Sequence, residues 1–238
     1  MGDKPAYQRV LLKISGEALM GDREYGLDRA TLERIAEDVR EVRDLGVEVC
    51  LVVGGGNIFR GIQGAAQGLD RATADYIGML ATVMNCLALQ NALEHQGHTV
   101  RVQTAIDMAA VAESYIRRRA IHQMEKGYIV VLGAGTGNPY FTTDTAAALR
   151  AMELECDVLI KATKVDGIYT ADPATDPSAQ RYERLSYRQA LDAEVGVMDL
   201  TAFTLCQENA MPIIVLNLWQ PDGITAAVRG EPVGTRVD

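Results

Sequence analysis

Short apolar runs alternate with amphipathic or alanine-rich segments along most of this 238-residue chain. The runs have the length of buried strands, and the segments between them repeat apolar residues at helical spacing. This alternation predicts a single α/β domain over residues 1–238, a three-layer αβα sandwich with a mainly parallel central sheet. The predicted strands span residues 9–14, 47–53, 99–104, 128–132, 157–161 and 213–217, and the predicted helices span residues 28–45, 70–96, 113–126, 145–155, 187–194, 201–209 and 223–229.

The composition limits the class of protein. A net charge of −9 and a pI near 4.9 argue against a non-specific binder of nucleic acid or membrane surfaces. We see neither a signal peptide nor an uninterrupted apolar run of roughly 18 residues, so we expect a soluble, cytoplasmic protein without a membrane or nucleic-acid partner. The scattered cysteines lack C-x-x-C spacing, which predicts buried free thiols and no metal site; they are Cys50, Cys86, Cys156 and Cys206.

Three consecutive glycines, Gly54 to Gly56, end the second predicted strand, and Arg60 follows them. Each glycine costs backbone entropy inside a strand or helix, so the run suits a place where the backbone approaches another group closely. Bare N–H groups after a strand, followed by a guanidinium, suit an anion such as phosphate. A tight turn beside a surface arginine is the alternative. If an anion binds, a side chain at Gly55 or Gly56 should obstruct the ligand more than it disturbs folding.

A second glycine-rich loop, residues 133–139, follows the strand at 128–132. Threonine hydroxyls and free N–H groups then gather where the next helix begins, which is again typical of a phosphate site. Asp144 lies in this helix start. It is either a first-turn carboxylate that complements the helix dipole or a group that orients a lysine or a metal ion.

Three further charged side chains are candidates for the same site. Lys13 and Lys161 lie near the carboxyl ends of two predicted strands, where open α/β sheets bind their ligands. Asp75 lies on the first turns of the long helix at 70–96. Lys13 could instead reach solvent from the strand end, and Asp75 could simply complement the helix dipole.

The two loops do not match the common nucleotide-binding motifs. G-x-x-x-x-G-K-[ST] is absent, and G-x-G-x-x-G fails because position 59 is Phe and position 138 is Asn. Two separate anion loops suit two phosphate-bearing ligands placed head to head. Phosphoryl transfer needs these ligands held in line, with cations around the migrating group. Lys13 and Arg60 could supply that charge, Asp144 could hold a lysine, and Mg²⁺ would arrive with the nucleotide.

Five long motifs together resemble the bacterial uridylate (UMP) kinase family of the amino-acid kinase superfamily. The resemblance runs from about Tyr7 to the end of the chain. It implies an amino-acid kinase-like fold, with an acceptor lobe over about residues 7–150 and an ATP lobe over about residues 151–238. The motifs are residues 13–17, 54–61, 78–85, 135–144 and 161–167.

The resemblance also implies an activity: Mg²⁺-dependent transfer from ATP to UMP, in a homo-hexamer activated by GTP and inhibited by UTP. It makes Lys13, Arg60 and Asp144 catalytic. The alternative is a non-enzymatic nucleotide-binding member with a storage or regulatory role. The residues implied for ATP are Lys13, Ile14, Ser15, Gly16, Gly56, Arg60, Thr163, Tyr169 and Asp172, and those implied for UMP are Gly55, Asp75, Thr136, Gly137, Asn138, Pro139, Tyr140, Phe141, Thr142 and Thr143.

Overall fold

The computed structural model describes residues 4–59, 68–171, 173, 175–176, 178–192 and 198–238. Two of the predicted site residues, Arg60 and Asp172, lie outside these described residues.

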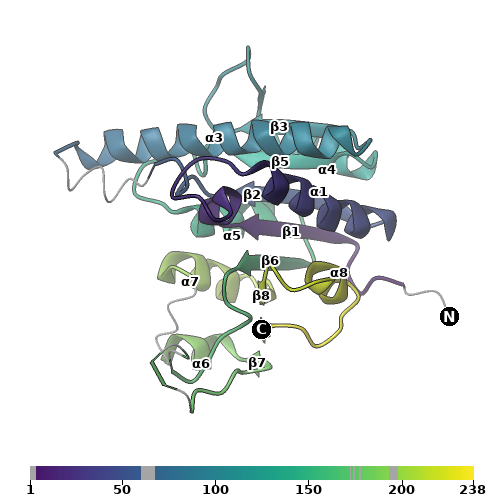
Figure 1. Cartoon of the computed structure of the whole chain (residues 1–238), viewed down its shortest axis with the longest axis vertical. Helices are drawn as coiled ribbons and strands as arrows, with labels where there is room; N and C mark the ends of the chain where they lie inside the picture. Colours follow the sequence, from purple (N-terminus) through teal and green to yellow (C-terminus); the bar gives the residue numbers. More distant parts are fainter. Residues whose placement is uncertain (1–3, 60–67, 172, 174, 177, 193–197) are drawn as a thin grey trace.

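A single sheet organises the described residues (Figure 1). Its strand order is β4-β3-β5-β2-β1-β6-β8-β9-β7, and every pair is parallel except β8 with β9. The predicted α/β class with a mainly parallel sheet is confirmed. The strands are β1 (Arg9–Ile14), β2 (Glu48–Val53), β3 (Val100–Thr104), β4 (Glu113–Ser114), β5 (Ile129–Gly133), β6 (Val158–Thr163), β7 (Arg184–Leu185), β8 (Ile213–Asn217) and β9 (Thr235–Val237).

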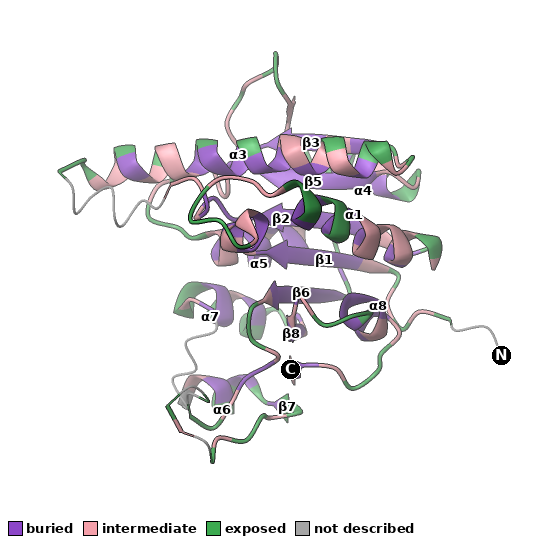
Figure 2. Ribbon diagram, in the orientation of Figure 1, coloured by how far each residue is buried: buried purple, intermediate pink, exposed green. Residues whose placement is uncertain are grey.

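Helices cover both faces of this sheet, because side chains alternate between the faces along each strand. Leu12 of β1 belongs to the core beneath α1, α3 and α8, whereas Leu11 belongs to the core beneath α4, α5 and α7. Figure 2 shows the strands buried and the exposed residues on outer helix surfaces and loops. The helices are α1 (Arg29–Asp44), α3 (Arg71–His95), α4 (Arg117–Glu125), α5 (Thr143–Glu153), α6 (Tyr187–Asp192), α7 (Leu200–Glu208) and α8 (Gly223–Val228), with a 3₁₀ helix, η1 (Gly16–Met20).

Aspartate side chains fix where three helices begin. Asp28, Asp70 and Asp199 each accept a hydrogen bond from a backbone N–H three residues later, at 2.9, 3.1 and 2.9 Å. These bonds satisfy donors that have no partner within the helix. Thr142 caps α5 in the same way, accepting from the N–H groups of Asp144 and Thr145.

The predicted helix over residues 113–126 is too long at its start. Residues Glu113 and Ser114 pair with the edge of β3 as strand β4, and the N–H of Tyr115 donates to the carbonyl of Thr104. The helix begins only at Arg117. A free sheet edge therefore overrides the local helical pattern at these residues.

The long helix α3 has two different sides. By length and composition it could cross a membrane, but 44% of the qualifying stretch is buried inside the fold. Leu89 and Leu93 belong to the core that also holds residues of β3 and β5. Three apolar side chains spaced four residues apart remain exposed along it: Tyr76, Leu80 and Met84.

Candidate functional site

Four neighbouring strands, β5, β2, β1 and β6, end at the same edge of the sheet. Because they are parallel, the segments that follow them meet there. The triple glycine follows β2, the second glycine loop follows β5, and the two predicted lysines come from β1 and β6. The convergence predicted from the sequence is therefore present in the fold.

Lys13 and Lys161 lie opposite each other in the register of β1 and β6. Two residues earlier, Leu11 and Leu159 face the core covered by α5, and period-two alternation turns both lysines toward the same side. Both lysines are buried, with 7% and 8% of their surfaces exposed. The interpretation of Lys13 as an edge lysine reaching solvent is wrong.

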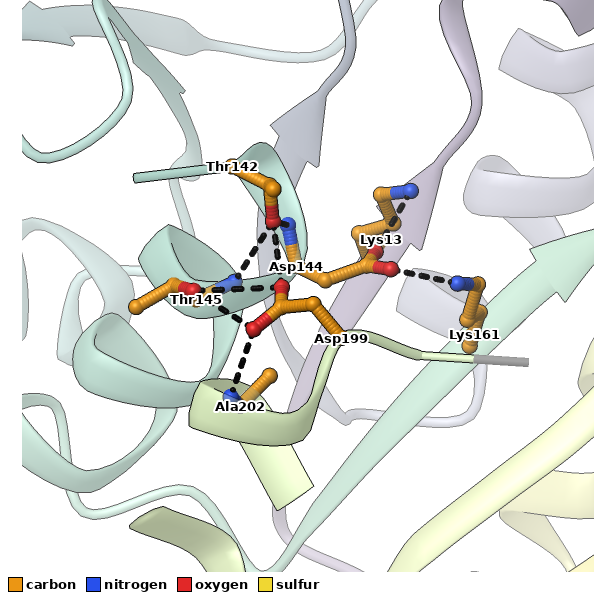
Figure 3. A network of polar contacts seen from close by, with 7 residues as sticks. All are labelled: Lys13, Thr142, Asp144, Thr145, Lys161, Asp199 and Ala202. Carbon is orange, nitrogen blue, oxygen red and sulfur yellow. Dashed lines mark hydrogen bonds and ion pairs between the residues drawn. The ribbon is translucent and has the colours of Figure 1, made fainter. Parts of the chain in front are cut away.

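Asp144 lies between these two ammonium groups (Figure 3). Its Oδ1 is 2.7 Å from Nζ of Lys13 and its Oδ2 is 2.6 Å from Nζ of Lys161. Both contacts are ion pairs, and the contact with Lys161 also has the geometry of a hydrogen bond. The charge of Asp199 also acts on Lys161, so two ammonium groups and two carboxylates gather at this edge of the sheet. The two ammonium groups are the part of this cluster that suits an anionic ligand.

The pKa values follow from burial and from these neighbours. Burial raises the pKa of Asp144, but the charges of Lys13 and Lys161 lower it by more, so it lies below the ordinary value of 3.8. Burial, together with the charge of Lys13, lowers the pKa of Lys161 below 10.5 although Asp144 opposes this shift. At neutral pH Asp144 is therefore an anion that stabilises the charged lysines.

Asp199, which the sequence reasoning missed, ties α5 to α7. Besides capping α7, its carboxylate accepts hydrogen bonds from the hydroxyls of Thr142 and Thr145 at the start of α5 (Figure 3). The available signal was an aspartate two residues before the predicted helix at 201–209. The Thr142 hydroxyl also caps α5, so contacts within the protein already use it as donor and acceptor.

The first glycine loop is packed by the protein itself. A β-carbon on Gly16 would lie 2.6 Å from the carbonyl oxygen of Gly54, and one on Gly54 would lie 2.8 Å from the amide nitrogen of Gly16. On Gly55 it would lie 2.8 Å from the carbonyl oxygen of Gly78 in α3. The expectation that a side chain at Gly55 would disturb a ligand more than the fold is therefore wrong.

A cavity of about 170 Å³ lies beside the loops and brings together six of the predicted UMP residues. It has an opening to solvent and also includes Arg71, which the sequence reasoning missed. The cavity is lined by Gly55, Phe59, Arg71, Asp75, Gly78, Met79, Thr82, Gly135, Thr136, Phe141, Thr142 and Thr143.

Asp75 is held in this cavity from two directions. Nε of Arg71 lies 2.9 and 2.8 Å from its two carboxylate oxygens, and the N–H of Tyr140 donates to Oδ2 at 2.8 Å. The guanidinium of Arg71 also lies 5.7 Å from the centre of the Tyr140 ring. Asp75 thus fixes the second loop, a role that a helix-dipole charge alone would not have.

The second glycine loop is strained and partly exposed. Ala134 and Tyr140 have positive φ angles of 61° and 72°, which non-glycine residues rarely adopt. Tyr140 and Phe141 are exposed. Thr136 and Asn138 bond each other locally, and Gly137 packs beside Ala105; Pro139 is half-buried on the same loop.

The other predicted ATP residues extend from the lysine cluster. Ile14 is fully buried, Ser15 is the cap residue that follows β1, and η1 begins at Gly16. Thr163 is on the same side of β6 as Lys161, two residues further on. The hydroxyl of Tyr169 donates to Asp166. No group of three or more His, Cys, Asp or Glu side chains that could hold a metal lies among the described residues, whose four cysteines are free and buried as predicted.

Comparisons with known proteins agree with this geometry. The amino acid kinase family profile matches residues 8–217. The solved UMP kinase of Bacillus anthracis is 41% identical, with a TM-score of 0.95 over 98% of this chain and 96% of that one. The UMP kinase of Ureaplasma parvum is 36% identical, with a TM-score of 0.92 over 97% and 98%. The uridylate kinase of Archaeoglobus fulgidus is 31% identical, with a TM-score of 0.76 over 96% and 99%.

Proposed function

Because this chain belongs to the amino acid kinase family, we propose that it transfers the γ-phosphoryl group of ATP to UMP, giving ADP and UDP for pyrimidine nucleotide biosynthesis. The observation that carries the proposal is the Lys13–Asp144–Lys161 cluster beside the cavity that contains Asp75. The near full-length likeness to solved UMP kinases supports UMP as the acceptor. A storage or regulatory protein would not need this charged cluster, so the enzyme is the better reading.

The donor side of the reaction would lie over β1 and β6, in line with an ATP lobe at about residues 151–238. The ammonium groups of Lys13 and Lys161 would stabilise the γ-phosphoryl group as its bond to ADP breaks and its bond to UMP forms. Lys13 and Asp144 act here together with Arg60, whose position is outside the described residues. The ATP contacts are proposed at Lys13, Ile14, Ser15, Gly16, Gly56, Arg60, Thr163, Tyr169 and Asp172.

The acceptor side would be the cavity, within a lobe at about residues 7–150. Asp75 would accept hydrogen bonds from the ribose, and the strained loop at 135–143 would surround the phosphate and the base. Arg71 adds a cation that neutralises part of the Asp75 charge beside an anionic ligand. The UMP contacts are proposed at Gly55, Asp75, Thr136, Gly137, Asn138, Pro139, Tyr140, Phe141, Thr142 and Thr143.

The residues fit a magnesium ion that arrives on the nucleotide phosphates. Oδ1 of Asp144 lies 2.7 Å from Nζ of Lys13, and a carboxylate oxygen has a second lone pair that could face the water shell of a cation. When bound, Mg²⁺ would supply further charge neutralisation for the phosphates. Asp144 would help to hold it.

We also propose a cytoplasmic homo-hexamer that GTP activates and UTP inhibits. The exposed Tyr76, Leu80 and Met84 of α3 support a contact between subunits, because a continuous apolar row on a helix is best covered by protein. Light scattering measures the assembly, and Leu80→Glu should reduce its mass. An unchanged mass would exclude this row as the contact.

The decisive experiment is a coupled assay of ADP release with UMP, CMP, dUMP, aspartate and carbamate as acceptors, with and without GTP or UTP. We expect the fastest release with UMP. Asp144→Asn protein is the control for contaminating kinases, and a reaction without acceptor measures ATP hydrolysis. No ADP with UMP would overturn the proposed function, and faster release with aspartate or carbamate would assign the chain to another acceptor class.

A further inference from the structure

Two polar side chains are buried in the middle of the apolar helix α3. Thr82 is 3% exposed and Asn85 is fully buried. They are three residues apart and therefore lie on one face of the helix. Buried polar groups are costly unless they are hydrogen-bonded, so their partners show what these residues do.

Thr82 holds the start of the second glycine loop. Its hydroxyl accepts a hydrogen bond from the N–H of Ala134 at 2.8 Å and donates to the carbonyl of Met79 at 2.6 Å. Ala134 has a φ of 61°, a left-handed conformation that costs about 1–2 kcal/mol in a non-glycine residue. The bond from Thr82 therefore stabilises the backbone at the point where the loop leaves β5.

Asn85 holds the first glycine loop. Its Nδ2 donates to the carbonyl of Gly54 at 2.6 Å and to Oδ1 of Asn57 at 2.7 Å. Asn57 donates back to Oδ1 of Asn85 at 3.0 Å and to the carbonyl of Gly26 at 2.8 Å. Both amide groups thus use both of their N–H donors, which fixes the orientation of each side chain.

The two loops are therefore attached to one rigid helix, one turn apart. We propose that Thr82 and Asn85 are positioning residues that set the spacing between the two glycine loops, and thereby the alignment of the two phosphate-bearing ligands. This inference rests on the proposed function, because alignment matters only if a group is transferred between the loops. A displacement of about 1 Å away from the reacting atoms can cost on the order of 10²-fold in rate.

The test separates alignment from stability. Thr82→Val keeps the shape of the side chain but loses the hydroxyl, whereas Thr82→Ser keeps the hydroxyl. Thr82 lines the acceptor cavity, but its hydroxyl is already used as donor and acceptor within the protein. We therefore expect Thr82→Val to lower kcat by about 10- to 100-fold, with a smaller rise in KM for either substrate. Thr82→Ser should recover most of kcat, and Asn85→Ala should repeat the loss through the other loop.

Leu93→Ala is the matched control, since Leu93 is fully buried on the same helix within the apolar core. It should lower the melting temperature and leave kcat of the folded protein unchanged. The inference is overturned if Thr82→Val behaves like Leu93→Ala. If Thr82→Val does not fold, the inference is tested with Asn85→Ala and Thr82→Ser. Asn85→Ala should then lower kcat more than it raises KM, and Thr82→Ser should keep most of kcat.

Hydrogen exchange at the Ala134 amide gives a measurement that does not depend on which substrate accepts the phosphoryl group. Thr82→Val should speed this exchange, and Leu93→Ala should leave it unchanged relative to neighbouring amides in β5. Absence of ADP release from the wild-type protein with UMP would refute the proposed function, whatever the exchange shows. Normal wild-type activity, with unchanged exchange and kcat in Thr82→Val, would refute only the positioning role.

Discussion

The two sides of the site use charge differently. On the β1–β6 side, Asp144 is buried between two lysines that strands hold in register. On the cavity side, Asp75 pairs with Arg71, whose side chain is 40% exposed, and supports a strained loop with exposed aromatic rings. The first arrangement is rigid because the sheet fixes it. The second depends on a few contacts at the surface, so it can adjust to a ligand.

The glycines of the two loops also differ in the reason that each is required. Gly16, Gly54 and Gly55 are required because backbone atoms of neighbouring segments occupy the space of any side chain. Gly135 has open space around its α-carbon and is required only for its φ of 57°. The same residue type thus serves packing in one loop and conformation in the other.

The largest effect should come from the rigid side. We expect Asp144→Asn to lower kcat by on the order of 10²-fold or more, because the two lysines lose the anion that orients them. The same change should destabilise the fold by about 3–5 kcal/mol, since it removes the carboxylate that is paired with two buried cations. Steady-state kinetics with UMP and urea unfolding measure the two effects. An unchanged kcat would remove Asp144 from the mechanism.

Two alanine variants test whether the glycines of the two loops are required for different reasons. Gly55→Ala should lower the free energy of unfolding by about 1–3 kcal/mol, because its β-carbon meets the α3 backbone. Gly135→Ala should cost about 1 kcal/mol, because the cost of about 1–2 kcal/mol for a left-handed alanine is partly offset by the lower entropy of the unfolded chain. Thermal unfolding of both proteins measures the difference. Equal losses would show that the loops do not differ in the way proposed.

The sequence predicted well which segments meet at the edge of the sheet, because their positions follow from local sequence patterns. Apolar runs set the strands, and the glycines and lysines at their ends could be placed at one edge from parallel order alone. Asp28 and the pair Ser186 and Gln189 also cap helices through contacts between residues three apart in the chain. These features involve residues close together in the chain or a rule of topology.

Contacts across the fold could not be predicted in the same way. The register that places Lys13 against Lys161, the approach of Gly55 to α3, and the link from Asp199 to α5 depend on how distant segments pack. The sequence around Glu113 does not indicate that this residue pairs with the edge of a sheet instead of starting a helix. Neighbouring residues determine propensity, whereas these contacts depend on tertiary packing.

A smaller effect is expected on the cavity side. Asp75→Ala should raise the KM for UMP about tenfold, which corresponds to about 1.4 kcal/mol, because the ribose and the Tyr140 N–H both lose an acceptor. The melting temperature should change little, since the contacts with Arg71 are partly exposed. Asp75→Asn keeps an acceptor oxygen, so its KM for UMP should lie between those of the wild type and Asp75→Ala. A fall in kcat without a change in KM would contradict the ribose role.

The smallest effect concerns the free energy of unfolding, which should depend on pH differently in the wild-type protein and in Asp144→Asn. The pKa of Asp144 is lowered, so its contribution to stability is present above 3.8 and is lost as the pH falls through its folded value. The pKa of Lys161 is also lowered, so its burial costs stability at neutral pH, and that cost disappears as the pH rises toward 10.5.

The gap in unfolding free energy between the two proteins should therefore be widest near neutral pH. As the pH falls below 3.8 and through the lowered folded pKa of Asp144, the wild-type carboxyl becomes protonated and comes to resemble the uncharged asparagine. At alkaline pH the variant recovers first, because without the Asp144 charge its Lys161 has a still lower pKa. The gap should narrow on both flanks, which urea unfolding followed by the fluorescence of the single tryptophan, Trp219, can measure. A gap that stays constant across this range would show that charge balance does not distinguish the rigid side from the cavity side.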